Sequence, residues 1–370
     1  MRVDFNVGVL LMQAFILFLN TSYALQISYI NYQAYTKIPY MAKIEDFPEI
    51  LQGQVVKTWI LEGTLPVEDL VENTNINAIP LEVKPSFGWT LKRTNMKMYP
   101  TDETIHGSNK DIDLNQYTLL EPFTFLAILH ISKDKKWLYV QSPFMRGWVK
   151  KEDVLIKERD ELLKIMSLPF LVVIKPKLYI KRIEFGLGSK IPYVEKEGNN
   201  YEVLLPDGSH ELVTLSEGFS DGYLSYSQEV IKNVLEGLIG EPYDWGGKYG
   251  YWDCSALVKD VFSLFGLDLP RNSQQQMQVG IKVKGRVRSY TELKDLLREL
   301  PPFRTLIFLK GHVMIYGGMQ NNDPVIYHSL YGIVRDDGTF YLAKRVEKNR
   351  LEGDMLTNIY KRVISINVLP

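Results

Sequence analysis

The chain has 370 residues, of which 45% are hydrophobic and 24% are charged, and this is the composition of a folded globular protein. Its 43 basic and 44 acidic residues give a formal net charge of −1, which argues against nucleic acid as a partner, because phosphate binding normally needs a basic excess. Cys254 is the one cysteine of the sequence, which excludes an internal disulfide and any site built from several cysteines.

The first 24 residues have the pattern of a secretory signal. A weakly basic start at Arg2 precedes an apolar run over Val9–Leu19, and Ser22-Tyr23-Ala24 fits a small-residue cleavage site. An uncleaved anchor and a buried helix are the alternatives. No later stretch is apolar for long enough to span a bilayer, so we expect an exported chain without a membrane span after the signal is removed.

Residues 25–85 predict a short helical segment, with helices around Ile44–Leu51 and Pro66–Val71. The segment is too small for a core of its own, so it should pack on another domain. Short alternating strands separated by polar turns then follow in two stretches, residues 86–157 and residues 158–217. Strands at this spacing are typical of small β-barrels, and we expect one in each stretch.

Residues 218–370 predict a third, mixed α and β domain. Ser225 and Gln228 have capping-box spacing, and Val230, Val234 and Leu238 follow one helical stripe. A glycine- and aromatic-rich loop leads to a second helix that begins at Cys254 or Ser255. The last third of the chain, from Leu306, reads as strands.

Cys254 has the position of a nucleophile. Helix N-termini stabilise a thiolate through the helix dipole and the N–H groups of the first turn, and the thiolate is the reactive form. The same N–H groups can stabilise an oxyanion. A thiol nucleophile also needs a base within hydrogen-bond reach.

Two of the five histidines lie in the same domain and are candidates for that base. His312 opens one predicted strand and His328 closes the next, and Gly317–Asp323 between them has the composition of a turn. If the hairpin has no bulge, the two histidines face each other across it, so that one imidazole acts as base and the other orients it.

Each of these residues also has a structural interpretation. A lone helical cysteine is usually a small buried hydrophobe, and a lone strand histidine is usually structural. Cys254, His312 and His328 could also bind zinc, although no fourth ligand is evident. The three together favour nucleophilic catalysis.

Five sequence blocks in order resemble the NlpC family of cell-wall cysteine peptidases. The blocks are Tyr243-Asp244-Trp245-Gly246-Gly247, Trp252-Asp253-Cys254-Ser255, Leu269-Pro270-Arg271-Asn272-Ser273-Gln274-Gln275, Gly311-His312-Val313-Met314-Ile315-Tyr316 and Tyr327-His328-Ser329. The whole layout resembles the subgroup that has an N-terminal helical segment and two bacterial SH3-type domains before the peptidase domain.

The resemblance implies an α+β multidomain chain. Its parts would be a signal peptide (1–24), a helical segment (25–85), two SH3-like β-barrels (86–157 and 158–217) and a papain-like α+β peptidase domain (218–370). It implies Cys254 as nucleophile, His312 as general base and His328 as the residue that orients His312. It implies no cofactor, and we expect no metal.

The implied reaction is hydrolysis of the bond between γ-D-glutamate and diaminopimelate or lysine in peptidoglycan stem peptides. In the SH3-bearing subgroup the matching positions Asp253, Ser255 and Ser273 bind the free amine of an N-terminal L-Ala, and a carboxylate with hydroxyls suits an ammonium group. Asp253 and Ser273 could instead cap the helices that follow them. An aromatic residue of the first SH3-type domain should line the site; Tyr99, Tyr117 and Tyr139 are candidates, although each is more typical of a core.

Two other functions stay open. One is hydrolysis of a different peptidoglycan amide in intact wall, and the other is a catalytically spent protein that binds wall peptides. In each case the partner is peptidoglycan or its muropeptides, and we expect a periplasmic or cell-wall location after export across the inner membrane.

Overall fold

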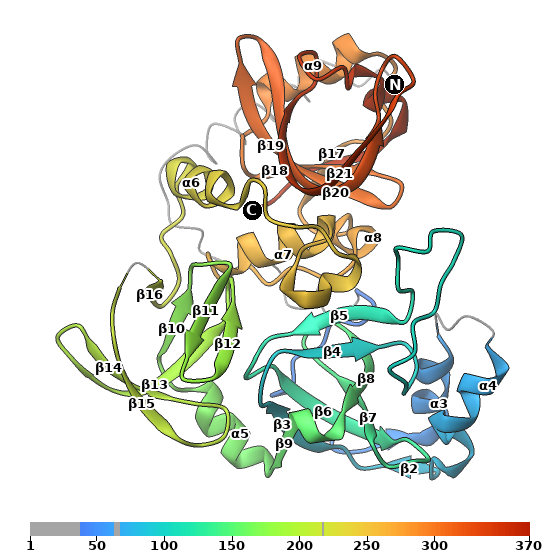
Figure 1. Cartoon of the computed structure of the whole chain (residues 1–370), viewed down its shortest axis with the longest axis vertical. Coiled ribbons are helices and arrows are strands. Elements are labelled where there is room, and N and C mark those ends of the chain that lie inside the picture. Colours follow the sequence, from blue (N-terminus) through green and yellow to red (C-terminus); the bar gives the residue numbers. More distant parts are fainter. Residues whose placement is uncertain (1–37, 63–66, 217) are drawn as a thin grey trace, which may run out of the picture. The chain divides into compact units, whose positions relative to one another are not determined.

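The computed structural model describes residues 38–62, 67–216 and 218–370 (Figure 1). The predicted signal segment lies outside the described residues. The described residues form two compact units, each of which is described here by itself. The β-domain unit comprises residues 38–224 and 244–271, and the C-terminal unit comprises residues 225–243 and 272–370. Within the described ranges, no helix has the length and apolar character needed to cross a membrane.

The N-terminal helical segment begins later than its apolar spacing predicts. The helices are α3 (Gly53–Leu61) and α4 (Glu68–Val71), followed by the 3-10 turns η2 (Glu72–Thr74) and η3 (Ile76–Ala78). The helix predicted around Ile44–Leu51 is wrong, because that stretch is irregular and ends in the short strand β1 (Leu51–Gln52), which pairs with β2 (Glu82–Val83). Pro48 disfavours a helix there, and Ile44 and Phe47 are buried without one.

This segment packs on the first β-domain, as its small size predicts. Val56 and Ile60 of α3 share one core cluster with Trp89, Tyr139 and other residues of the first β-domain. The segment therefore contributes to the core of its neighbour rather than forming one of its own.

The first β-domain is one antiparallel sheet in the order β5-β4-β8-β7-β6-β3-β9. Its strands are β3 (Ser86–Thr90), β4 (Thr94–Lys97), β5 (Gln116–Leu120), β6 (Phe125–Ile131), β7 (Trp137–Gln141), β8 (Arg146–Lys150) and β9 (Val154–Lys157), with the 3-10 turn η4 (Lys151–Asp153) before β9. A second core cluster, which includes Met96, Leu126 and Val140, is fully buried.

The second β-domain follows helix α5 (Arg159–Met166). It has a five-stranded sheet in the order β15-β14-β13-β10-β16 and a separate hairpin, β11-β12. The strands are β10 (Phe170–Val173), β11 (Lys177–Ile180), β12 (Ile183–Gly186), β13 (Lys190–Glu197), β14 (Asn200–Leu204), β15 (His210–Thr214) and β16 (Phe219–Asp221). Its core is built on Leu171, Phe185 and Val203.

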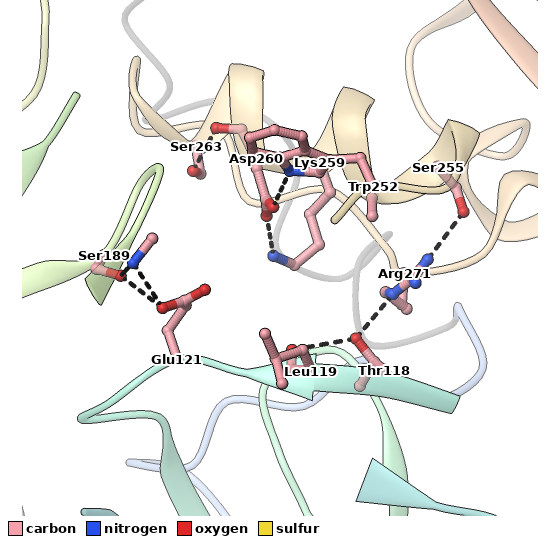
Figure 2. Close-up of polar contacts among 12 residues, drawn as sticks. Thr118, Leu119, Glu121, Ser189, Trp252, Ser255, Lys259, Asp260, Ser263 and Arg271 are labelled. Atoms are coloured by element: carbon pink, nitrogen blue, oxygen red, sulfur yellow. Dashed lines mark hydrogen bonds and ion pairs between the residues drawn. The ribbon is translucent and has the colours of Figure 1, made fainter. Parts of the chain in front are cut away.

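A cluster of charged side chains joins the two β-domains. Arg93 of the first contacts Glu121 of its own domain at 2.7 Å and Glu184 of the second at 2.5 Å. The other carboxylate oxygen of Glu121 accepts hydrogen bonds from the backbone N–H of Gly186 and the hydroxyl of Ser189. Figure 2 shows Glu121 beside Ser189. These largely buried, charge-assisted bonds fix the second β-domain against the first.

Residues 244–271 belong to the same unit and contain the 3-10 turn η5 (Trp245–Gly250) and helix α7 (Cys254–Ser263). Gly246 has φ = 65°, and a Cβ placed on it would lie 2.6 Å from the backbone oxygen of Gln116 in β5. Only glycine allows both this conformation and this close approach. The loop before α7 is thereby pressed onto the first β-domain.

The C-terminal unit is built on a six-stranded antiparallel sheet in the order β17-β22-β18-β19-β20-β21. The strands are β17 (Ile281–Lys284), β18 (Thr305–Leu309), β19 (His312–Gln320), β20 (Asp323–Val334), β21 (Phe340–Arg350) and β22 (Val363–Val368). The helices are α6 (Gln228–Leu238), α8 (Ser273–Gln276) and α9 (Tyr290–Glu299), with the 3-10 turn η6 (Thr357–Arg362). Leu293 and Leu297 of α9 are fully buried in the core cluster of this sheet.

Helix α6 is capped by a different serine from the one predicted. Ser227 is the N-cap, and its hydroxyl accepts a hydrogen bond from the N–H of Val230 at 3.1 Å, so the assignment to Ser225 is wrong. The buried residues of α6 are Ile231, Leu235 and Leu238. The predicted stripe of Val230, Val234 and Leu238 is therefore right at Leu238, whereas at its first two positions the buried residue is the next one along the chain.

The β19–β20 hairpin has a bulge, whereas the prediction that the two histidines face each other assumed a hairpin without one. Ile315 pairs with Tyr327, and the register then shifts before Met319, across two glycines. In this register His328 lies two residues from the position directly opposite His312. The turn itself is Asn321-Asn322, and both residues have positive φ, as a type I′ hairpin turn requires.

Candidate active site

Cys254 is the first residue of α7, as predicted, and its side chain is partly exposed. Asp253 is the N-cap, and its carboxylate accepts a hydrogen bond from the N–H of Ala256 at 2.9 Å. The capping alternative for Asp253 is thus confirmed. The only cysteine of the sequence is placed at the positive end of a capped helix, where a thiolate is favoured.

Asp253 is also one half of a buried ion pair. Its carboxylate meets the Arg271 guanidinium through two hydrogen bonds, of 2.6 and 3.0 Å, and accepts further bonds from the N–H of Gly246 and the hydroxyl of Ser255. Burial raises the pKa of Asp253, but Arg271 and the hydrogen bonds outweigh burial and hold that pKa below its ordinary value. The aspartate is therefore ionised at neutral pH.

Arg271 connects the helix of the candidate nucleophile to the first β-domain. Its Nε donates to the hydroxyl of Thr118 in β5 at 2.8 Å, while one terminal nitrogen donates to Ser255 Oγ at 3.0 Å. Figure 2 shows Arg271 between Thr118 and Ser255. Since Arg271 is 2% exposed, one buried guanidinium holds the strand, the cap and the first turn of α7 together.

The three predicted amine-binding residues have different surroundings. Asp253 already accepts five hydrogen bonds from within the chain, and Ser255, which is buried, bonds Asp253 and Arg271. Ser273 is partly buried and belongs to the C-terminal unit, where it is the first residue of α8. Asn272 is the N-cap there, so the capping alternative for Ser273 is wrong.

The two predicted histidines contact each other in the C-terminal unit. His312 begins β19 and is partly exposed, whereas His328 lies within β20 and is fully buried. His312 Nε2 lies 2.9 Å from His328 Nδ1, and His328 Nε2 lies 2.8 Å from Asn349 Oδ1. The long side chains bridge the two-residue offset in the ladder.

The environment of His328 keeps this ring neutral. Burial lowers the pKa of His328, and the bond to Asn349 and the charge of Glu347 only partly offset this. A buried neutral imidazole can orient a neighbouring histidine without competing for its proton.

The sequence interpretation missed two of these residues. Arg271 stands within a recognised block, and a buried role was not assigned to it. Asn349 lies in an ordinary-looking polar strand and gave no signal, because only the pairing of β20 with β21 brings it to His328. Among the described residues, no group of three or more His, Cys, Asp or Glu side chains is arranged to hold a metal ion.

The candidate aromatic residues divide by burial. Tyr99 and Tyr139 are 1% and 3% exposed, which is typical of core side chains. Tyr117 of β5 is partly exposed. The lining role of any of the three stays a prediction, and exposure favours Tyr117.

Comparison with known families identifies two domains. Residues 101–150 match the profile of the SH3 domain of the SH3b1 type, and residues 240–360 match that of the NlpC/P60 family. The mixed α and β content and the order of the domains agree with the predicted fold class.

Curated relatives and solved structures point the same way. The chain is 25% identical over 150 residues to a γ-D-glutamyl-L-lysine dipeptidyl-peptidase of Bacillus cereus, a match that covers 37% of this chain and 44% of the relative. It is 25% identical over 141 residues to the enzyme of that name from Bacillus subtilis, covering 36% and 46%. The matches thus span less than half the length of these relatives.

Two solved structures share the fold over most of the chain. An NlpC/P60 endopeptidase from Photobacterium damselae superposes with a TM-score of 0.64 at 21% identity, covering 81% of this chain and 77% of the other. An NlpC/P60 family protein from Bacillus cereus superposes with a TM-score of 0.56 at 19% identity, covering 77% of this chain and all of the other.

Proposed function

Since this chain is a member of the NlpC/P60 family, with an SH3 domain of the SH3b1 type before its NlpC/P60 domain, we propose that it is a secreted cysteine peptidase of peptidoglycan. Its substrate bond is the one between γ-D-glutamate and diaminopimelate or lysine in stem peptides. The observation that carries the proposal is the placement of Cys254 at a capped helix start, together with the His312–His328 pair. The bond specificity is supported by the names of the curated relatives.

The proposed mechanism uses Cys254 and His312 in turn. His312 takes the thiol proton, and the thiolate attacks the scissile carbonyl. We assign the developing oxyanion to a backbone N–H at the start of α7, where Cys254 is the first residue. His312 then protonates the leaving amine, and water hydrolyses the thioester. His328 holds the His312 ring throughout.

The bond specificity is tested by digestion of defined stem peptides followed by mass spectrometry. With L-Ala-γ-D-Glu-diaminopimelate and its lysine counterpart, the expected products are L-Ala-γ-D-Glu and the free diamino acid. Cleavage elsewhere in a longer stem, with the γ-D-glutamyl bond left intact, contradicts the proposed specificity. Reaction under metal-free conditions should be unchanged, because no step uses a metal.

A free N-terminal amine on the substrate should accelerate cleavage. We propose that Ser255 and Ser273, with the charge of Asp253, recognise the ammonium of L-Ala. Because Asp253 already accepts five hydrogen bonds, contacts of the ammonium with the hydroxyl groups are favoured over a direct contact with the carboxylate. Acetylating that amine removes a charge-assisted hydrogen bond, which is expected to lower kcat/KM about 10- to 100-fold. Equal rates for the free and the acetylated tripeptide would contradict amine recognition.

The two alternative functions make distinct predictions. An enzyme for another wall amide would digest intact sacculi faster than soluble stems, whereas the proposed enzyme prefers the soluble stems. A spent binding protein would keep affinity for stem peptides, yet its Cys254 would show no enhanced, pH-dependent reaction with iodoacetamide. The retention of Cys254, His312 and His328 together favours the enzyme.

A further inference from the structure

A line of three hydrogen bonds extends from His312 into the C-terminal unit. It runs from His312 Nε2 to His328 Nδ1 (2.9 Å), from His328 Nε2 to Asn349 Oδ1 (2.8 Å), and from Asn349 Nδ2 to Asp354 Oδ2 (3.4 Å). In the β20–β21 ladder His328 faces Glu347, and Asn349 is two residues further along β21. Strand alternation therefore puts Asn349 on the same face as His328.

Asp354 determines which way the Asn349 amide points. The amide nitrogen donates to the Asp354 carboxylate, which is itself held by the backbone N–H of Arg350 at 2.7 Å. The reversed amide would put its oxygen against that carboxylate, where two acceptors repel each other. Asn349 therefore presents its oxygen, which can only accept, to His328.

This fixed acceptor determines the tautomer of both histidines. A hydrogen bond to Asn349 Oδ1 requires the proton of His328 to be on Nε2. Because buried His328 is neutral, its Nδ1 carries no proton and accepts a hydrogen bond from the Nε2–H of His312. A neutral His312 then has its lone pair on Nδ1, the ring nitrogen that the His328 bond does not use.

We propose that Asn349 is a positioning residue that, through His328, holds His312 in the tautomer with a basic Nδ1. The inference rests on the proposed function, in which His312 accepts the proton of Cys254. The proton then moves from Sγ to His312 Nδ1 and later to the leaving amine. His312 Nε2–H keeps donating to His328 throughout, so no proton passes along the line.

The tautomer can be read without turnover. In the full-length protein labelled with ¹⁵N-histidine, NMR at a pH where both rings are neutral should show His312 protonated at Nε2. Asn349→Leu removes the acceptor and should give His312 a mixture of both tautomers, with kcat lowered at least about tenfold and KM nearly unchanged. Lys348→Leu is the matched control, since the neighbouring Lys348 bonds Glu236 and neither histidine. It should keep the wild-type histidine spectrum and kcat.

A second variant keeps the proposal testable if Asn349→Leu does not fold. Asn349→Asp has the same shape, and its carboxylate favours a protonated His328. The groups facing His328 are His312 from β19, Glu347 and Asn349 from β21, and Asp354 behind Asn349. The acid limb of kcat/KM should move about one unit or more to higher pH, because an opposite charge at hydrogen-bond distance favours the charged form. If Asn349 only supported folding, the substitution would leave the acid limb of the kcat/KM pH profile at the wild-type pH.

The outcomes separate this inference from the proposed function. An unchanged His312 tautomer in Asn349→Leu, or an unmoved acid limb in Asn349→Asp, overturns the role of Asn349. If the wild-type protein cleaves no stem peptide, the proposed function fails, yet the NMR comparison still decides whether Asn349 fixes the tautomers.

Discussion

Replacing Cys254 with alanine is expected to lower kcat for L-Ala-γ-D-Glu-diaminopimelate by at least about a thousandfold, because the nucleophile and its covalent pathway are lost together. The side chain is only partly buried, so the change should alter the free energy of unfolding by less than about 1 kcal/mol. Initial rates from chromatography of the products, with unfolding followed by circular dichroism, check both expectations.

Cys254→Ser serves as the matched control for shape. It keeps an oxygen nucleophile whose pKa is far higher, and its kcat should stay far below that of the wild type. A Cys254→Ala protein that cleaves the tripeptide as fast as wild type would refute the assignment of the nucleophile.

Replacing Arg271 with methionine should strongly destabilise the β-domain unit. The substitution leaves Asp253 as a buried carboxylate without its partner, and breaking a buried pair this way costs about 3–5 kcal/mol. It should also lower kcat, because the cap of α7 loses its anchor to Thr118. Urea unfolding and initial rates measure the two effects.

Companion variants separate the charge from the contacts of Arg271. Adding Asp253→Asn to Arg271→Met removes the buried charge, and the double variant should be more stable than the single one. Arg271→Lys keeps a positive charge but not the two-pronged bond, and Thr118→Val removes one acceptor, so both should be milder. Equal stability of wild type and Arg271→Met would show that the ion pair contributes nothing.

The pair also predicts how stability depends on pH. Because the folded-state pKa of Asp253 is lowered, its contribution is complete above the ordinary aspartate pKa and is lost as the pH falls through the lowered value. Wild type should therefore lose this contribution only below the ordinary aspartate pKa. The free-energy difference between wild type and the Arg271→Met, Asp253→Asn double variant, measured from neutral pH downward, should narrow in that range.

Local patterns predicted the parts of the site that depend on local structure. The start of α7 at Cys254 and the Asp253 cap follow from apolar spacing and capping chemistry, which act within one turn. The two strands of His312 and His328 were also predicted, but their register was not, since the glycine bulge shifts it without leaving a clear pattern. The histidines meet despite the shift because their side chains reach across it.

Residues that act through distant pairing could not be predicted in this way. Arg271 meets Thr118 across 153 residues of sequence, and Asn349 reaches His328 only through the β20–β21 ladder. The prediction of a helix around Ile44–Leu51 was wrong for a related reason. Ile44 and Phe47 are buried against the first β-domain, so their spacing reflects tertiary packing rather than a helix. Tertiary contacts leave little trace in a local window.

Trapping the acyl-enzyme shows directly whether Cys254 is the nucleophile. The protein is mixed with an excess of L-Ala-γ-D-Glu-diaminopimelate, quenched in acid at short times, and analysed by intact-mass and peptide mass spectrometry. We expect a transient mass increase equal to the L-Ala-γ-D-Glu acyl group, located on Cys254 and missing from Cys254→Ala. Product formation by a Cys254→Ala protein, or an acyl group located on another residue, would contradict it.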